Sequence, residues 1–384
     1  MIYYGKQTID QADIRSVVDV LKGKYLTQGP MIFKFEDILK KKFGSKYCCV
    51  LSSGTGGLYL TGIALGWKKG DIVLSSPTTF LASINCINYV NATPDFVDID
   101  SLTHTIDVNL LEHKVKKYKK NGKKVKAVIG VDYAGHPADW KALRFLANKY
   151  NFQLINDNCH ALGATYLGDE KYATKYADVV VQSYHPVKHI TTGEGGAVFT
   201  NDKLIDKKIR ALRSHGIIKK GNNKKFGLWY YEMFNVGFNY RITDLQCALG
   251  ISQMKKLNKF VHLRRKIANF YNEALEENAN CLIPHEDKNV QHAYHLYPVQ
   301  AEFDNLKNNK IIFFNKMKSK GIQLQVHYIP VHLQPYYKKN FKFKYGDFPI
   351  SEKFYKNEFS IPIYPSLKKS DINKIIGEIN KNLV

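Results

Sequence analysis

The feature that most restricts the fold of this chain is an alternation of strand-like and helix-like segments over its first half. Short apolar runs, rich in valine and isoleucine, alternate with stretches whose apolar residues recur at helical spacing. The strand-like runs are Tyr47–Leu51, Ile72–Leu74, Pro94–Ile99, Val125–Val131, Phe152–Ile155, Ala177–Val181 and Ala197–Phe199. This alternation predicts an α/β fold with a mainly parallel seven-stranded sheet and helices on both faces.

Helical spacing and a later change of pattern divide the chain into two parts. The helices expected in the first part are Asp10–Lys22, Ile32–Phe43, Leu58–Leu65, a segment after Phe80, Val108–Tyr118 and Asp139–Tyr150. Later segments are a helix from Asp244 to about Leu257, helices Lys259–Asn278, Leu306–Lys320 and Lys369–Leu383, strands His295–Val299 and Leu324–Val326, and an aromatic loop. We therefore predict a large domain, residues 1–250, and a small C-terminal α+β domain, residues 251–384.

The composition excludes several classes of function. The formal net charge is +23, but it rests on 50 lysines and only seven arginines, spread along the chain. Because arginine is the preferred reader of phosphates and bases, we do not expect nucleic-acid binding, although a positive field favours small anionic substrates. The six cysteines show no C-x-x-C spacing, which indicates packing in a reducing compartment. Without a signal region or a membrane-length apolar run, we expect a cytoplasmic protein with no membrane partner.

One lysine stands between two core strands. Lys188 lies in the segment SYHPVKHITTGEGGAVF, residues 183–199, which links the predicted strands Ala177–Val181 and Ala197–Phe199. Its glycines allow the backbone to turn tightly and to approach a ligand closely. A buried lysine is costly unless it has a partner or a task. The segment therefore admits two interpretations, an ordinary surface lysine or a functional amine.

Polar residues also follow several other predicted strands, at the sheet edge where ligands of such folds bind. The run Ser52-Ser53-Gly54-Thr55-Gly56-Gly57 joins a strand to a helix, a geometry that directs backbone N–H groups at a phosphate, although a plain tight turn is the alternative. Asp157 follows another strand, either as a helix N-cap or as the carboxylate partner of a cofactor ring nitrogen. Two histidines, His185 and His189, have helical metal-ligand spacing, but Pro186 argues against a helix there, so we expect no metal site.

Taken together, nine segments resemble the DegT family of pyridoxal-phosphate-dependent sugar aminotransferases, which have the type I aminotransferase fold. In chain order they are LTQGP, SSGTGG, PTTFLAS, DYAGH, DNCHALG, SYHPVKHITTGEGGAV, RSHG, FNYRITDLQCALGISQMKKL and QVHYIP. The resemblance extends over nearly the whole chain. Within the family it is strongest to the enzymes of pseudaminic acid biosynthesis, a route to surface polysaccharides.

The resemblance implies roles for individual residues. Lys188 matches the lysine that carries pyridoxal phosphate, and Asp157 matches the partner of the pyridine nitrogen. The remaining cofactor contacts implied are Thr55, Gly56, Phe80, His160, Ser183 and Asn239, the last from the second subunit of a homodimer. The substrate contacts implied are Tyr4, Lys24, Tyr25, Leu26, Thr27, Gln325, Val326, His327 and Tyr328.

The implied reaction transfers the amino group of L-glutamate to C4 of a UDP-linked 4-keto-6-deoxy-N-acetylhexosamine. Relatives that are dehydratases carry histidine at the lysine position, so Lys188 favours transamination. The same chemistry on a UDP-ketopentose, on a GDP- or dTDP-linked ketohexose, or at C3 is the alternative. An alternative of another class is a regulator that binds the cofactor without turnover.

Overall fold

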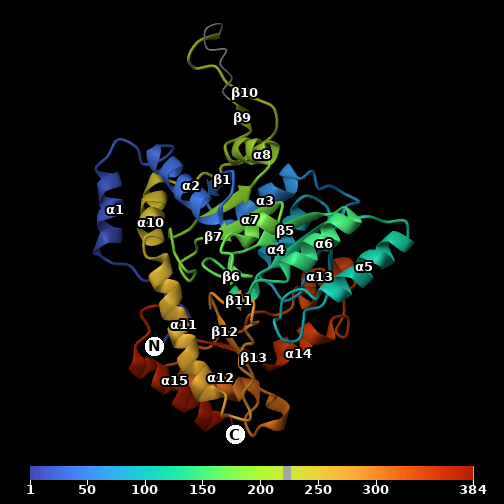
Figure 1. The fold of residues 1–384 in the computed structure, drawn as a ribbon, viewed down its shortest axis with the longest axis vertical. Coiled ribbons are helices and arrows are strands. Elements are labelled where there is room, and N and C mark those ends of the chain that lie inside the picture. The colour runs from blue at the N-terminus through green and yellow to red at the C-terminus, as the bar shows by residue number, and fades with distance from the viewer. Residues whose placement is uncertain (219–225, 384) are drawn as a thin grey trace.

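A seven-stranded sheet forms the centre of the molecule in the computed structural model, which describes residues 1–218 and 226–383 (Figure 1). Its strands are β1 (Tyr47–Leu51), β2 (Ile72–Ser75), β3 (Thr93–Phe96), β4 (Val125–Val131), β5 (Gln153–Asp157), β7 (Val179–Ser183) and β8 (Gly196–Thr200). The order is β1-β8-β7-β5-β4-β2-β3. Strand β8 pairs antiparallel with β1 and with β7, and the other pairs of neighbouring strands are parallel. The predicted mainly parallel sheet is confirmed.

Both faces of this sheet are covered, which explains its continuous apolar strands. Along β7, Val179 and Val181 belong to one buried cluster while Val180 belongs to the cluster on the opposite face. The first cluster includes residues of α3 (Gly54–Ala64), α4 (Ala82–Tyr89) and α8 (Lys203–Arg213). The opposite cluster includes residues of α2 (Pro30–Phe43), α5 (Val108–Lys120), α6 (Trp140–Tyr150), α7 (Tyr172–Tyr176) and α10 (Asp244–Met254).

The C-terminal part forms the lower half of the molecule in Figure 1 and has a core of its own. The long helix α11 (Leu257–Leu275) runs down into this half from the region of the sheet (Figure 1). A two-stranded antiparallel sheet, β12 (Tyr297–Gln300) with β13 (Glu358–Ile361), packs with α12 (Lys310–Ser319) and α15 (Lys369–Asn382). The division at residue 250 stays a prediction.

Several smaller elements complete the described chain. They are α1 (Gln11–Leu21), α13 (Pro335–Phe341), α14 (Pro349–Asn357), β6 (Thr165–Tyr166), β11 (Val290–Gln291), β9 (Ile217–Ile218) and β10 (Glu232–Met233). The last two strands pair in an arm that projects from the top of the molecule in Figure 1. Among the described residues, no helix has the length and apolar character needed to cross a membrane.

Two predictions for the C-terminal part are wrong, and the start of a predicted helix is shifted. The segment Leu324–Val326 is not a strand, because only Gln325 forms a bridge, to Ser360. The segment expected to be an aromatic loop contains α13, α14 and β13. The strand β13 was hidden because it begins with Glu358, a charged residue that is fully buried and would ordinarily indicate a surface position. In addition, α12 begins at Lys310, after the N-cap Asn309, and not at Leu306.

Strand β4 leads to the cavity described below and packs tightly against α6, which makes Gly130 sensitive to substitution. A Cβ atom at Gly130 would lie 2.7 Å from Cη2 of the fully buried Trp140. We expect Gly130→Ala to lower the free energy of unfolding by about 1–3 kcal/mol, because the indole ring has no room to move. Urea denaturation of both proteins measures this difference.

A matched control is Gly377→Ala in α15, where a Cβ atom meets nothing within 4 Å. Because glycine lowers helix stability, this substitution should raise the free energy of unfolding by up to about 1 kcal/mol. Equal effects of the two substitutions would contradict the packing described for β4 and α6.

Candidate active site

A cavity of about 490 Å³ opens where several strands of the large sheet end. Its floor includes Ser53, Val131, Asp157 and Ser183, which lie at or just after the carboxyl ends of β1, β4, β5 and β7. The other lining residues are Tyr4, Gly54, Thr55, Leu58, Thr79, Phe80, Ala82, Cys159, His160, His185, Val187, Lys188, Glu194, His295, Gln325, Val326, His327 and Tyr328. Most of the residues singled out in the sequence are therefore brought together.

Lys188 lies in the turn between β7 and β8 and is half-buried in the cavity wall. Its backbone N–H donates to the carbonyl oxygen of His185 at 2.9 Å, and the N–H of Thr192 closes the loop onto the carbonyl oxygen of Tyr184 at 3.0 Å. Its Nζ lies 3.3 Å from Nε2 of His295. Lys188 is thus held inside the cavity and is not an ordinary surface lysine.

His295 is a site residue that the sequence reasoning missed. Its ring centroid lies 4.4 Å from that of His160 and 5.8 Å from that of His189, so His295, which contacts the lysine amine, belongs to a cluster of three imidazoles. In the sequence His295 was the first residue of a predicted strand, and nothing in its spacing indicated contact with residue 188. Only the fold brings the two residues together.

A buried arginine fixes the backbone of His295. The guanidinium of Arg264, on α11, donates to the carbonyl oxygens of Tyr294 at 3.1 Å, His295 at 3.2 Å and Ile363 at 2.8 Å. Within the described chain its hydrogen-bond acceptors are all backbone carbonyls, so no carboxylate neutralises its charge. A positive charge without a counter-charge disfavours protonation of basic groups nearby.

The surroundings of Lys188 favour a neutral amine. Burial lowers the pKa of Lys188 from its usual range and the charge of Arg264 lowers it further, whereas Cys159 and Asp157 oppose the shift. Burial also lowers the pKa of His295 well below its usual range, and a positive charge on Lys188 adds to that effect. Two basic groups 3.3 Å apart cannot both be protonated cheaply.

The neutral imidazole of His295 has a preferred tautomer. Its Nδ1 is buried and has no hydrogen-bond partner in the described chain. An N–H at that position would be an unsatisfied buried donor, which is rarer in proteins than an unsatisfied acceptor. This favours the tautomer with its proton on Nε2, the nitrogen that lies 3.3 Å from Nζ of Lys188.

Asp157 presents a carboxylate to the same cavity. Its Oδ2 accepts from Oγ of Ser83 at 2.6 Å, and its Oδ1 accepts from the backbone N–H of Cys159 at 3.2 Å. Oγ of Ser83 lies 2.9 Å from Oγ1 of Thr79, which holds the hydroxyl in place. No helix begins in the segment after Asp157, so the N-cap interpretation of this residue is wrong.

The N-terminus of α3 faces the cavity through the predicted glycine loop. Oγ of Ser53 caps the helix by accepting from the N–H of Gly56 at 3.0 Å, whereas the N–H groups of Gly54 and Thr55 find no acceptor in the described chain. A Cβ atom at Gly54 would lie 2.9 Å from Cβ of Ser183, so only glycine allows this approach. Free N–H groups at a helix N-terminus suit a phosphate group. Gly56 itself is buried behind the cavity wall.

Aromatic residues also line the cavity. Phe80 is 55% exposed although it lines the cavity, and its ring centroid lies 5.9 Å from that of Tyr328. Oη of Tyr328 lies 3.2 Å from Nε2 of His160, whose Nδ1 accepts from the N–H of Ala134 at 3.3 Å. An exposed aromatic ring above buried polar groups is a surface on which a flat ring can stack.

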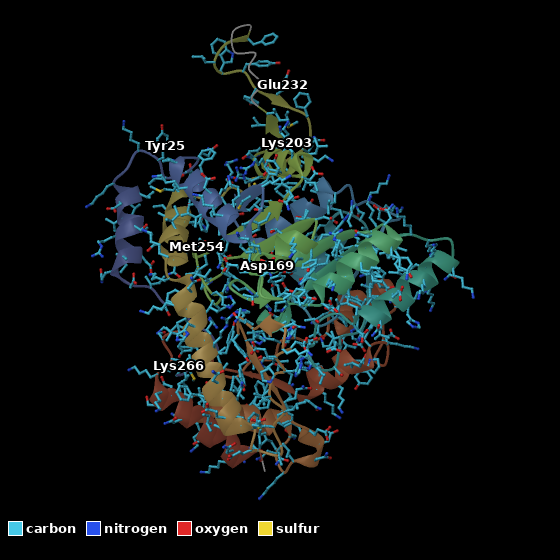
Figure 2. All side chains as sticks on the ribbon, viewed as in Figure 1. Tyr25, Asp169, Lys203, Glu232, Met254 and Lys266 are labelled. Carbon is cyan, nitrogen blue, oxygen red and sulfur yellow. The ribbon has the colours of Figure 1, made fainter. Side chains whose placement is uncertain are left out.

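Two groups of predicted residues do not reach this cavity. Asn239 is exposed and forms a backbone bridge to Ser214, outside the lining. The segment Lys24–Thr27 is exposed next to the start of α10, where the carbonyl oxygen of Leu26 accepts from the N–H of Asp244 at 2.9 Å. Figure 2 shows Tyr25 at the outer edge of the molecule. Within one chain, therefore, these residues lie apart from Lys188.

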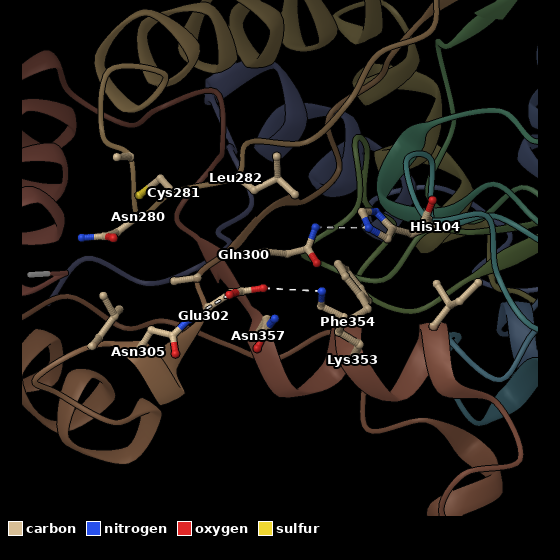
Figure 3. A pocket seen from close by; sticks show the side chains of 15 residues that line it. His104, Asn280, Cys281, Leu282, Gln300, Glu302, Asn305, Lys353, Phe354 and Asn357 are labelled. Atoms are coloured by element: carbon tan, nitrogen blue, oxygen red, sulfur yellow. Dashed lines mark hydrogen bonds and ion pairs between the residues drawn. The ribbon is translucent and has the colours of Figure 1, made fainter.

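A second hollow of about 460 Å³ lies elsewhere, between His104, Gln300 and α14 (Figure 3). Several of its polar groups contact one another, since Nζ of Lys353 lies 3.4 Å from Oε1 of Glu302 and Nε2 of Gln300 lies 3.3 Å from Nε2 of His104. Because it contains none of the residues singled out in the sequence, it is not the candidate active site. The described residues include no group of side chains suited to hold a metal ion.

Comparison with known proteins gives one consistent family. Residues 7–380 match the model of the DegT/DnrJ/EryC1/StrS aminotransferase family. A relative from Campylobacter jejuni, named UDP-4-amino-4,6-dideoxy-N-acetyl-beta-L-altrosamine transaminase, is 38% identical over 374 residues, which cover 97% of this chain and 94% of the relative.

Solved structures of aminotransferases have the same fold. Helicobacter pylori PseC, an aminotransferase involved in the biosynthesis of pseudoaminic acid, superimposes with a TM-score of 0.90 at 29% identity and covers 100% of this chain and 99% of its own. The putative sugar aminotransferase Spr1654 from Streptococcus pneumoniae, in its PMP form, superimposes with a TM-score of 0.91 at 26% identity over 100% of both chains.

The lowered pKa of Lys188 is directly measurable. In cofactor-free protein, we expect reductive methylation to modify Lys188 at a lower pH than the exposed lysines, because burial and the charge of Arg264 disfavour its ammonium form. Peptide mass spectrometry across a pH series measures the modified fraction at each lysine. The exposed lysines of the same sample are the internal reference, and modification of Lys188 in step with them would contradict the site described.

Proposed function

The chain belongs to the DegT/DnrJ/EryC1/StrS aminotransferase family, and we propose that it transfers the amino group of L-glutamate to C4 of a UDP-linked 4-keto-6-deoxy-N-acetylhexosamine. It is a pyridoxal-phosphate-dependent sugar aminotransferase. The observation that carries the proposed site is the convergence of Lys188, Asp157 and the α3 N-terminus on one cavity. The UDP-linked sugar is supported by the name of the relative from Campylobacter jejuni.

In this proposal each group of the cavity has one task toward the cofactor. Bound pyridoxal phosphate would supply an electron sink and a carbonyl carbon that carries the amino group from the donor to the acceptor. Nζ of Lys188 would hold the cofactor and, when released, would move a proton between the two reacting carbon atoms. A neutral lysine amine, as the contact with His295 favours, is able to accept that proton.

The remaining polar groups orient the cofactor. The carboxylate of Asp157 would keep the pyridine nitrogen protonated, because a nearby negative charge favours the protonated form. Ser83 and the N–H of Cys159 hold this carboxylate in place. The N–H groups of Gly54 and Thr55, with the hydroxyl of Ser183, would bind the phosphate, and the ring of Phe80 would cover the pyridine face.

The second substrate uses the same cavity. Tyr4 and the segment Gln325–Tyr328 also line the cavity, and we assign them to the sugar. Because glutamate and the ketosugar react in turn at Lys188, we expect ping-pong kinetics.

We also propose that the active form is a homodimer with shared sites. The arm that includes β9 and β10 projects from the body of the molecule and exposes Leu228, Trp229 and Val236 by 87%, 81% and 78% (Figure 1). Apolar side chains exposed to this degree indicate a contact surface. A second copy of the chain that packs against this arm would bring its Asn239 and its Lys24–Thr27 segment to the cavity, which a single chain does not do.

The visible absorption of the bound cofactor tests the reaction. Glutamate should bleach this absorption in the purified enzyme, and a UDP-4-keto-6-deoxy-N-acetylhexosamine should restore it, because the amine passes first to the enzyme and then to the sugar. Lys188→Ala should abolish the cycle, whereas Lys353→Ala, a change in the second hollow, should leave it intact. Bleaching that only another ketosugar reverses would overturn the proposed substrate, and the absence of any bleaching would overturn the proposed donor.

Mixed dimers test the shared site. Lys188→Ala and Asn239→Ala should each be nearly inactive as homodimers. After the two are mixed and allowed to exchange subunits, about a quarter of the native activity should return, because each hybrid dimer contains one complete site. Activity that stays at the level of the parents after proven exchange would show that Asn239 acts within its own chain.

A further inference from the structure

Three side chains form a hydrogen-bonded row behind the sugar wall of the cavity. Oγ of Ser360, in β13, lies 2.5 Å from Oε1 of Glu358 and 2.9 Å from Nδ1 of His327. Glu358 and Ser360 are 0% and 1% exposed, and His327 is the member of the row that lines the cavity. The row thus runs from a buried carboxylate, through one hydroxyl, to an imidazole at the substrate site.

The direction of these hydrogen bonds follows from the number of protons that the carboxylate, the hydroxyl and the imidazole can each donate. An ionised carboxylate only accepts, so the single hydroxyl proton of Ser360 is donated to Glu358. Toward His327 the serine oxygen therefore acts as an acceptor, and Nδ1 of the imidazole carries the proton that it accepts. The other ring nitrogen, Nε2, then has a free lone pair.

The charge states of the row give this direction at a pH above the pKa of Glu358, where its carboxylate is ionised. Burial lowers the pKa of His327 to about 3, and the charge of Lys188 acts in the same sense, so the ring is neutral and has one proton. Burial raises the pKa of Glu358 to about 7, while Ser360, Lys310 and the N–H of His327 oppose this rise. Burial raises the pKa values of the phenols of Tyr133 and Tyr328, and the charge of Glu358 acts in the same sense on both.

The backbone and ring of His327 are held firmly. Its N–H donates to Oε2 of Glu358 at 3.0 Å, and its carbonyl oxygen accepts from Oη of Tyr133. Its ring centroid lies 5.3 Å from that of Tyr4, another lining residue. Nε2 has no hydrogen-bond partner in the described chain, yet it is not among the buried unpartnered atoms, so it is accessible from the cavity.

We propose that Glu358 and Ser360 are positioning residues that hold His327 in its Nδ1–H form, so that Nε2 accepts a hydrogen bond from an O–H or amide N–H group of the sugar. The inference rests on the proposed function, since the ligand is the sugar of that reaction. The Nδ1–H form makes this wall selective. A sugar that places only an acceptor, such as a keto oxygen, at Nε2 faces a lone pair and forms no hydrogen bond there.

The variant Glu358→Gln tests the row without changing its shape. The N–H of His327 still needs an acceptor, so the amide oxygen should take that place and the NH₂ group should face Ser360. The NH₂ group then donates to Oγ of Ser360, whose own proton turns to Nδ1 of His327. The imidazole proton should therefore move to Nε2, and His327 should become a donor toward the cavity.

The ¹⁵N chemical shifts of the imidazole report this tautomer without any turnover. They are measured on the full-length protein labelled at histidine, with the His327 signals assigned by their loss in His327→Gln, at a pH well above the pKa of Glu358. The native protein and Ser360→Thr, which keeps the hydroxyl, should show Nδ1–H, and Glu358→Gln should show Nε2–H. A native protein with Nε2–H, or a tautomer unchanged in Glu358→Gln, would overturn the proposal.

Kinetics connects the tautomer with the sugar. In Glu358→Gln and Ser360→Ala, we expect kcat/KM for the ketosugar to fall about tenfold or more, while the half-reaction with the amino donor stays unchanged. The matched control is Ser351→Ala, which removes a buried serine that donates to Asp98 at 2.6 Å but contacts no imidazole. An equal loss in the control, or an equal loss in both half-reactions, would show a merely structural effect and overturn the proposal.

The same experiment separates the two levels of inference. An Nδ1–H tautomer that inverts in Glu358→Gln, in a protein that does not aminate the UDP-linked sugar, would overturn the proposed substrate and leave the row intact. Amination of that sugar by a protein in which His327 has the Nε2–H tautomer would overturn the proposed role of the row and leave the proposed substrate intact.

Discussion

The contact between the amine of Lys188 and Nε2 of His295, 3.3 Å long, is the interaction to which much of the rest of the site is adapted. It brings two bases together where neither is easily protonated, because both are largely removed from water and the buried charge of Arg264 lies nearby. A lysine is ordinarily charged and exposed. Burying its amine beside another base therefore stabilises the folded chain less than apolar side chains at the same positions would. The fold keeps the amine available for chemistry at that cost.

The two halves of the molecule supply different parts of the cavity. The large sheet provides the carboxylate of Asp157, the free N–H groups of α3 and the turn that carries Lys188. The C-terminal part provides His295 and the wall around His327, and α11 ties the halves together because Arg264 binds carbonyl oxygens of both. The groups proposed to hold the cofactor thus lie mainly on the sheet, whereas most of the groups proposed to read the sugar, Gln325–Tyr328, lie on the smaller part, which can vary without disturbing the sheet.

Much of the fold was readable from the chain because its signals are local. Seven apolar runs alternate with helical spacing, and each became a strand of the central sheet. The missed strand β13 shows the limit of such signals. Its first residue, Glu358, reads as a surface residue, and only its contacts with Ser360 and the backbone of His327 explain why it is buried. The sequence also singled out the carboxylate, the amine and the glycine loop that the fold brings to one cavity, since each belongs to a segment that follows a strand at the ligand-binding edge of the sheet.

What the sequence determined by itself was the type of sheet, the segments that meet at its edge, and the residue types that a cofactor with a phosphate and a ring nitrogen requires. What only the tertiary structure decided was which distant groups surround them. His295 is 107 positions from Lys188, and Ser360 is 33 positions from His327, so neither partner has a signature in local spacing. Protonation states and tautomers depend on such contacts and on burial, which exist only after the chain has folded.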